Sequence, residues 1–193
     1  MTVRPRVLAA VLVAFAGFRI VSTYHVFSQA FDEPAHVAAG MEWLDRGRYT
    51  YETQHPPLAR AAVALGPYLS GLRSTGASWL FHEGNLILME RGTYVRNLAL
   101  ARLGALPFFA LTALVVWLWT RRLFGEGAAL AAVALLTTLP PVLAHAGFAT
   151  TDMALTATLT LALYQGVRWL DDRVTARSLA AGASVGLAVS AKF

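Results

Sequence analysis

The sequence contains no cysteine among its 193 residues. Disulfide bonds, thiolate metal sites and cysteine nucleophiles are therefore excluded. Charge is scarce as well, since only 14% of the residues are charged, whereas a soluble domain carries roughly 25%. Together with a hydrophobic content of 56% and a mean hydropathy of +0.52, this composition predicts a membrane protein.

Several catalytic motifs are also missing. There is no glycine-rich phosphate loop, serine nucleophile elbow or HExxH zinc motif, and we find no internal repeat. The net charge of +5 could indicate nucleic-acid binding, but the arginines are scattered beside apolar runs. This distribution is typical of a protein oriented in a lipid bilayer, so we expect a bilayer and no nucleic acid as the partner.

Five apolar runs predict an all-α, polytopic transmembrane bundle. The expected spans are about residues 7–27, 98–119, 127–144, 153–169 and 178–193. The first run could instead be a signal peptide, because Ala14-Phe15-Ala16 resembles a cleavage site, but it continues to Phe27 and is long enough to span. Arg19 inside it should face protein or water, and Pro140-Pro141 should end or kink the third span. Because the fifth run stops at Phe193, we expect the chain to be the N-terminal part of a longer protein and inactive by itself.

Arginine positions predict the orientation of these spans. The N-terminus and the loops at about 121–126 and 168–177 are rich in arginine, whereas no lysine or arginine lies between Arg122 and Arg168. By the positive-inside rule the N-terminus is cytoplasmic. The segment 28–96 and the hairpin tip at 144–152 then lie outside, together with all five histidines and eight of the eleven acids. We therefore expect the chemistry on the periplasmic or extracellular face of the cell membrane.

Two helices are expected in the long outer segment. The first runs from Glu33 to about Arg46, with Asp32 as its N-cap and Gly47 at its end. The second follows His55-Pro56-Pro57, and its apolar stripe consists of Leu58, Ala62, Leu65, Leu69 and Leu72. Amphipathic helices of this kind lie in the membrane interface. They would frame a shallow cavity that a lipid-linked substrate enters from the side.

Asp32, Glu33 and Asp152 are the candidate catalytic residues. Asp32 and Asp152 could each merely cap a helix, and Glu33 could merely favour the helix dipole. However, two adjacent carboxylates with His36 one turn on can hold a proton, a metal or a sugar hydroxyl. A carboxylate beside an apolar interface can also act as a general base. Asp152 is the one acid between Glu126 and Asp171, and its place near the membrane face favours a functional role.

The candidate substrate-binding residues are basic. His36, His55, Arg60, Arg96, Arg102 and His145 could each contact a phosphate or a sugar. As single residues the arginines could equally be interface anchors, and His55 could belong to a helix-start turn. His25 and His82 are expected to be structural. Asp32 and Asp152 with the nearby histidines permit a divalent-cation site without requiring one.

Three motifs resemble the multi-span glycosyltransferases that use polyprenyl-phosphate sugars. These motifs are Phe31-Asp32-Glu33-Pro34-Ala35-His36, His55-Pro56-Pro57-Leu58-Ala59-Arg60 and the segment 144–152 that ends in Asp152. The protein O-mannosyltransferases and the aminoarabinose transferases that act on lipid A belong to this group, which has the GT-C fold. The order of span, long outer loop and further spans matches nearly the whole chain.

The resemblance implies an inverting transfer from a lipid-phosphate sugar to a hydroxyl of a protein, lipid or glycan. Asp32 would be the catalytic base, Glu33 its neighbour, and Asp152 the acid of the second outer loop, while His55 would help to form the donor site. Residues 1–193 would form the N-terminal part of the transmembrane domain, because such proteins have about a dozen spans and a later outer loop. A transporter and a non-catalytic structural subunit are the alternatives. The former places its acids at the bilayer midplane, and the latter keeps Asp32 and Asp152 far apart.

Overall fold

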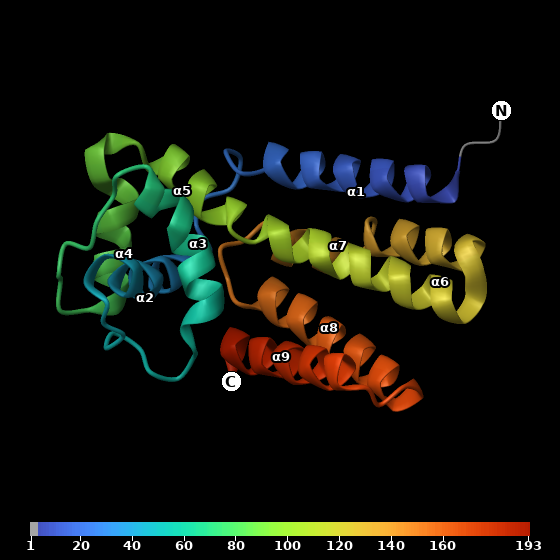
Figure 1. The fold of residues 1–193 in the computed structure, drawn as a ribbon. Helices are drawn as coiled ribbons and strands as arrows, with labels where there is room; N and C mark the ends of the chain where they lie inside the picture. Colours follow the sequence, from blue (N-terminus) through green and yellow to red (C-terminus); the bar gives the residue numbers. More distant parts are fainter. Residues whose placement is uncertain (1–3) are drawn as a thin grey trace.

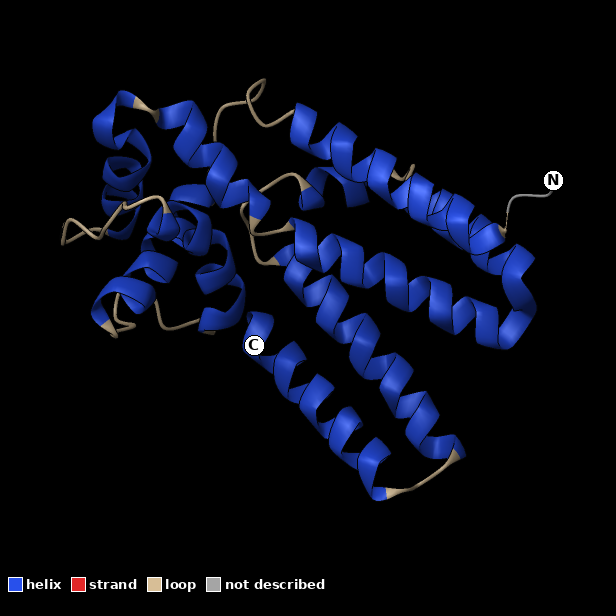
Figure 2. Cartoon of the chain, turned by 45° about the horizontal axis from the view of Figure 1, so that its top comes forward, coloured by secondary structure: helices blue, strands red, loops and turns tan. Residues whose placement is uncertain are grey.

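The structure, a computed structural model, describes residues 4–193, and every regular element within them is a helix (Figure 2). The elements, coloured along the chain in Figure 1, are α1 (Pro5–Ser22), α2 (Glu33–Arg46), α3 (Pro57–Leu69), α4 (Leu80–Met89), the short 3₁₀ helix η1 (Glu90–Gly92), α5 (Tyr94–Leu103), α6 (Leu106–Leu136), α7 (Pro140–Ala146), α8 (Asp152–Asp171) and α9 (Thr175–Lys192). The expectation of an all-α protein is confirmed.

The helices form two regions. The first, which we call the lobe, contains α2 to α5 and lies on the left in Figure 1. The second, the bundle, contains α1, α6, α8 and α9, which run from the lobe toward the right of the view. Within the bundle α6 packs against α1 and α8, and α8 packs against α9. The two regions are joined where α3 packs against α9 and α5 continues into α6.

Two segments are long and apolar enough to cross a membrane, namely Pro5–Ser22 and the stretch Tyr94–Leu136, which contains α5 and α6. The helices α8 and α9 have 20 and 18 residues but are less apolar, so the count of five spans stays a prediction. The first helix is shorter than expected, because the chain leaves it at Ser22 and turns at Thr23. Arg19 consequently lies in the last turn of α1 and is exposed.

Two breaks divide the apolar residues between Leu106 and Ala146. Gly125 has a φ of 86°, which lies in the region that favours glycine, and the chain reverses direction there (Figure 1). The following helical stretch ends at Leu136, and Pro140-Pro141 begin α7. The expected break at these prolines is confirmed, because a proline is tolerated in the first turn of a helix but not in its interior.

The α2 helix lies at the centre of the lobe. Every residue from Glu33 to Glu42 is buried, because α3 and α4 cover two of its sides. Close approach is possible where glycine lacks a side chain: a Cβ on Gly40 would lie 2.0 Å from the Arg60 carbonyl oxygen, and one on Gly84 would lie 2.0 Å from that of Pro34. The first ten residues of α2 thus lie in the core of the lobe, and the expectation of an amphipathic interfacial helix is not confirmed for α2.

The predicted apolar stripe is divided between the surface and the core, because Leu72 at its end is buried but two leucines of α3 are not. Leu65 and Leu69 are 45% and 75% exposed, whereas Val63 and Ala64 are buried. The reason is again the approach to Gly40, which admits only small side chains on the facing side of α3. The large leucines therefore lie on the outer surface of the lobe.

Candidate functional site

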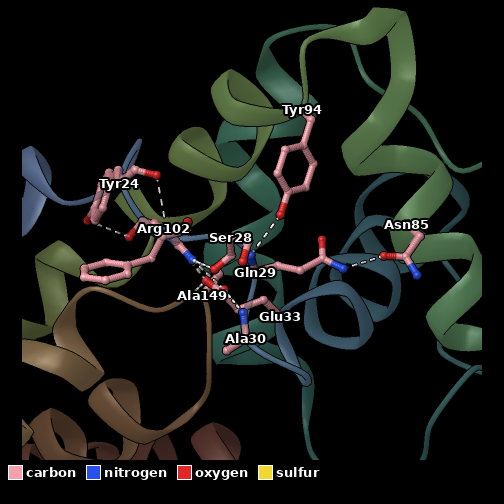
Figure 3. Close-up of polar contacts among 10 residues, drawn as sticks. Tyr24, Ser28, Gln29, Ala30, Glu33, Asn85, Tyr94, Arg102 and Ala149 are labelled. Atoms are coloured by element: carbon pink, nitrogen blue, oxygen red, sulfur yellow. Dashed lines mark hydrogen bonds and ion pairs between the residues drawn. The ribbon is translucent and has the colours of Figure 1, made fainter.

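Two polar sites lie at the N-terminal turn of α2. The first, which we call the Glu33 cluster, is completely enclosed: Glu33 is 0% exposed and Arg102 of α5 is 1% exposed. Arg102 donates from Nε to Glu33 Oε1 at 2.9 Å and from Nη2 to Oε2 at 2.8 Å. The backbone N–H groups of Ala149 and Ala30 donate to the same carboxylate. Figure 3 shows how these groups converge from α5, the α1–α2 connection and the loop before α8.

Arg102 is used entirely within the protein. Its remaining N–H groups donate to the backbone carbonyls of Tyr24, Phe27 and Ser28, so all five donors of the guanidinium have partners. The predicted substrate-binding role of Arg102 is therefore not supported, because no donor is left for a phosphate. Glu33 is likewise saturated, and its role is to join three distant segments of the chain.

The second site is a pocket of about 260 Å³, which we call the Asp32 pocket. It is lined by Asp32, Ala35, His36, Glu52, Gln54, His55, Arg60, Leu80, Phe81, Thr151, Asp152 and Lys192. These residues come from α2, α3, α4, the loop between α2 and α3, the start of α8 and the end of α9. Five of the predicted site residues, Asp32, His36, His55, Arg60 and Asp152, thus line a single pocket.

Asp32 is exposed in this pocket and precedes the first residue of α2. It occupies the N-cap position, but its side chain makes no capping hydrogen bond. Within residues 4–193 its carboxylate has no hydrogen-bond or ion-pair partner. The interpretation of Asp32 as a mere helix cap is therefore not supported, and its carboxylate remains available to a ligand.

Asp152 is the first residue of α8, just before the predicted span, and it does not cap that helix either, since Thr151 occupies the N-cap position. It forms ion pairs with Lys192 and, at 3.5 Å, with His145, and Thr150 Oγ1 donates to it at 3.3 Å. Burial raises the pKa of the Asp152 carboxyl, but the bond to Lys192 and the neighbouring His145 outweigh burial and hold the pKa below its usual value. Asp152 is thus an ionised partner that orients Lys192.

Arg60 and the two histidines form the opposite wall. Arg60 donates from Nε to His36 Nδ1 at 3.2 Å and forms an ion pair with Glu52. His55 Nδ1 lies 3.0 Å from the backbone carbonyl of Lys192, which ties the α2–α3 loop to the end of α9. Positive and negative groups therefore both line the pocket.

Two predicted residues lie elsewhere. Arg96 is exposed on α5 and does not line the pocket. His145 is 53% exposed in its side chain and reaches the site only through its contact with Asp152.

A divalent cation finds no ready set of ligands here. Among the described residues no group of three or more His, Cys, Asp or Glu side chains is arranged to hold a metal ion, and Asp152 already bonds to Lys192. The residues of the pocket do not fit a resident metal, and we derive no step from one.

Glu52 and Lys192 were not predicted. Lys192 is the single lysine of the sequence and ends an apolar run that was expected to emerge on the outer face, so orientation could have indicated it. Glu52 lies in an irregular loop without any periodic pattern, and its pairing with Arg60 depends on how that loop folds back on α3.

One of three comparisons with known proteins identifies a family. No curated protein and no solved structure matches the chain. The family model described as dolichyl-phosphate-mannose-protein mannosyltransferase matches residues 73–193, a region that contains Asp152 and Lys192 but not Asp32. Because this region is more than half of the chain, the protein belongs to the dolichyl-phosphate-mannose-protein mannosyltransferase family, whose members are membrane glycosyltransferases.

Proposed function

We propose that this protein is an inverting glycosyltransferase, which moves a sugar from a polyprenyl-phosphate donor to an acceptor hydroxyl at the outer face of the membrane. The observation that carries the proposal is the Asp32 pocket. It combines an unpaired carboxylate, Asp32, with a cation, Lys192, and lies beside apolar helices. The Asp32 carboxylate can accept the proton of an acceptor hydroxyl, and the Lys192 ammonium group can neutralise the charge of a departing phosphate.

The reaction follows from these two groups. Asp32 accepts the proton of the acceptor hydroxyl while the oxygen attacks the anomeric carbon. The bond between that carbon and the phosphate oxygen breaks, and its electron pair leaves with the polyprenyl phosphate. Attack from the face opposite the leaving group inverts the configuration of the sugar. A general base of this kind contributes about 10²–10⁴-fold to a rate.

The leaving phosphate gains negative charge during this step. Lys192 is the flexible cation of the pocket, because Arg60 is buried and paired with Glu52. Asp152 holds the Lys192 ammonium group near the pocket. Preorganised positive charge at the place where negative charge develops is a large contribution to catalysis. Asp152 would then act as a positioning residue rather than as a second base.

The arrangement of the helices supports the outer location. The start of α1, the reversal within α6 and the α8–α9 connection lie at the right-hand end of the bundle in Figure 1, whereas the lobe lies at the other end. Arg4 directly precedes α1, and Arg121-Arg122 come just before the reversal at Gly125. The arginine-rich end is expected on the cytoplasmic side. The pocket, which is built largely from the lobe, would then face the outside.

The base assignment is tested with Asp32→Asn in the full-length protein, with polyprenyl-phosphate mannose as donor and a serine- and threonine-containing peptide as acceptor. We expect the rate to fall by about 10²–10⁴-fold without a change in thermal stability. Asp171→Asn is the matched control, because this acid pairs with Arg122 at the opposite end of the bundle. A folded Asp32→Asn protein that keeps the full rate would contradict the proposal, as would a product with retained configuration at the anomeric carbon.

The outer location has an independent test, because the sequence has no native cysteine. Single cysteines are introduced at Thr53, which is exposed in the α2–α3 loop, and at Glu126, which is exposed at the opposite end. A membrane-impermeant maleimide should label Thr53→Cys in intact cells and Glu126→Cys only after permeabilisation. The reverse pattern would place the pocket in the cytoplasm and refute the orientation.

A further inference from the structure

The bond between Arg60 and His36 fixes the state of the histidine ring. Arg60 donates from Nε to Nδ1 of His36 at 3.2 Å. A guanidinium group has only donors and does not lose its proton in proteins. Nδ1 must therefore be the unprotonated, accepting nitrogen, and the ring proton must lie on Nε2. As long as this bond exists, His36 is neutral and is a single tautomer.

Arg60 itself has little freedom to release His36. Its side chain is 2% exposed, and it forms an ion pair with Glu52 and donates to the Tyr49 hydroxyl at 3.2 Å. Tyr49 in turn donates to the backbone carbonyl of His55 at 2.6 Å. The α2–α3 loop thus supplies a rigid support for the guanidinium, and through it for the imidazole.

The other ring nitrogen of His36, Nε2, has no partner within residues 4–193. His36 lines the Asp32 pocket, and no described residue accepts a hydrogen bond from Nε2. Within residues 4–193 the completely enclosed side-chain atoms without a partner are Gln29 Oε1 and Trp119 Nε1. His36 Nε2 is therefore not completely enclosed. Its N–H group is therefore free to donate to a ligand.

The electrostatic surroundings agree with a neutral ring. Burial, the Arg60 guanidinium and His55 lower the pKa of His36 to about 4, although Asp152 and Glu52 act in the opposite direction. Asp32 on the same turn and Lys192 of α9 also line the pocket, while α4 contributes the uncharged Leu80 and Phe81. At neutral pH the ring therefore carries no charge.

We propose that Glu52 and Arg60 hold His36 as a neutral Nε2–H tautomer, which donates a hydrogen bond to a phosphate oxygen of the lipid-linked sugar donor. This inference rests on the proposed function. A phosphate oxygen is the strongest acceptor that such a substrate offers, and hydrogen bonds to ionised groups are roughly twice as strong as neutral ones. The bond strengthens as charge develops on the leaving phosphate, so it contributes more to the transition state than to binding. Glu52 and Arg60 are positioning residues in this scheme.

The same arrangement excludes His36 as the general base. Its Nδ1 is occupied by Arg60, and its Nε2 already carries a proton. Neither nitrogen can accept the proton of the acceptor hydroxyl, which leaves this role to Asp32. The two residues have separate tasks although they lie one turn apart on α2.

The tautomer is tested without any activity assay. The full-length protein is labelled with ¹⁵N-histidine in detergent micelles, and the signals of His36 are assigned by comparison with His36→Gln. We expect one unprotonated and one protonated nitrogen between pH 5.5 and 7.5, with no titration in that range. A His36 ring that titrates there, or that carries its proton on Nδ1, would overturn the inference even in an active enzyme.

The donor role is tested by two substitutions that differ in where they place an amide N–H. The amide nitrogen of Gln can occupy the position of Nε2, whereas the shorter Asn reaches only the position of Nδ1. We expect His36→Asn to lower kcat by about 10²–10³-fold, as the loss of one donor to a developing anion does. His36→Gln should keep a larger share of the rate, and the KM of the acceptor should change little in both. Equal losses in the two variants, or an effect confined to the acceptor KM, would refute the phosphate contact.

The positioning role predicts a new pH dependence. In Arg60→Gln the repulsion by the guanidinium is absent, so the pKa of His36 rises from about 4, while burial, the largest cause of the low value, still holds it below the ordinary value of about 6.5. The ring should then take up a proton at a higher pH than in the parent protein, and the pH at which the rate changes should move upward by the same amount. The double variant Glu52→Gln/Arg60→Gln, which leaves no unpaired charge, should behave in the same way if the single variant folds poorly. Unchanged pH profiles in both variants would contradict the positioning role.

These outcomes separate the two proposals. If the protein transfers no sugar but His36 shows the fixed tautomer, the proposed function fails while the ring geometry holds. If Asp32→Asn abolishes transfer and His36 titrates near pH 6.5, only the inference about His36 fails.

Discussion

The Glu33 cluster and the Asp32 pocket contain neighbouring carboxylates with opposite surroundings. Glu33 is enclosed and receives donors from Arg102 and two backbone N–H groups, whereas Asp32 is exposed and unpaired within residues 4–193. The difference arises because the first turn of α2 directs Glu33 toward α5 and leaves Asp32 beside α8 and α9. A carboxylate whose acceptor sites are filled holds the fold together, and one whose sites are open can bind and react.

The largest expected effect is a loss of stability when the enclosed Glu33 cluster is disrupted. Glu33→Gln leaves the Arg102 guanidinium buried without its counterion, which typically costs about 3–5 kcal/mol in a buried ion pair. We expect a loss of this size in the free energy of unfolding, measured by denaturation in detergent micelles. Because Asp32→Asn removes an exposed and unpaired charge, it should leave the same quantity within about 0.5 kcal/mol.

The double variant Glu33→Leu/Arg102→Met is the control for this prediction. Replacing both partners of a buried ion pair by apolar residues is often neutral, so much of the lost stability should return. If Glu33→Gln were as stable as the parent protein, the division between a structural and a catalytic carboxylate would not hold.

The second effect concerns Lys192, the cation of the Asp32 pocket. Lys192→Gln removes the charge that we propose meets the leaving phosphate, and we expect kcat to fall by about 100-fold. Lys192→Arg retains a positive charge and should keep more of the rate. The measurement is sugar transfer at saturating donor, together with the inhibition of the enzyme by polyprenyl phosphate. An unchanged kcat in Lys192→Gln would remove Lys192 from the reaction.

A smaller effect is expected where α4 supports the turn that carries both carboxylates. A Cβ on Gly84 would lie 2.0 Å from the carbonyl oxygen of Pro34, so Gly84→Ala should push α4 away from α2. Overpacking of this kind costs about 1–3 kcal/mol, measurable as a lower midpoint of thermal unfolding. Gly17→Ala is the matched control, because no atom lies within 4 Å of the added Cβ in α1. Equal midpoints for the two variants would argue against the close contact.

The smallest effect is a pH dependence of stability from Glu83, which resembles Glu33 in being enclosed. Burial raises the pKa of Glu83, but hydrogen bonds from Thr75, Ser74 and backbone N–H groups outweigh burial and hold the pKa below its usual value. A group whose pKa is lower in the folded state stabilises that state above its unfolded pKa of about 4.3 and loses this contribution as the pH falls through the folded pKa.

Glu83→Gln should therefore be less stable than the parent at pH 7, and the difference should shrink below about pH 4. Thermal unfolding of both proteins across pH 3–7 measures this convergence. A difference that stays constant over the whole range would show that the Glu83 charge does not contribute.

Much of the site could be predicted because the relevant signals are local or topological. Asp32 and His36 are four residues apart on a helix whose start and end were both indicated, by Pro34 and Gly47. Asp152 could be assigned to the same side of the membrane from the arginine distribution alone. The burial of α2 was not predicted, because hydrophobic periodicity reports which face is apolar but not how many neighbours cover the helix.

The partners of the charged side chains could not be predicted from the neighbouring sequence. Arg102 was expected to bind a substrate, yet it lies 69 positions from Glu33 in the sequence and pairs with it only after α5 packs against α3 and α4. Glu52 meets Arg60 because an irregular loop folds back, and no periodic pattern encodes such a path. Lys192 approaches Asp152 because α8 and α9 pack side by side.

The sequence by itself determined that this protein is helical and membrane-associated, with its acids and histidines gathered at one end. These properties depend on composition, on the length of apolar runs and on the placement of arginine. Each of these can be read from a local segment of the chain without knowing which segments come into contact. The tertiary structure alone decided which carboxylate is open to a ligand and which is enclosed. That choice depends on burial and on whether each acceptor oxygen finds a donor, and both are set by segments far apart in the sequence that meet only when the chain is folded.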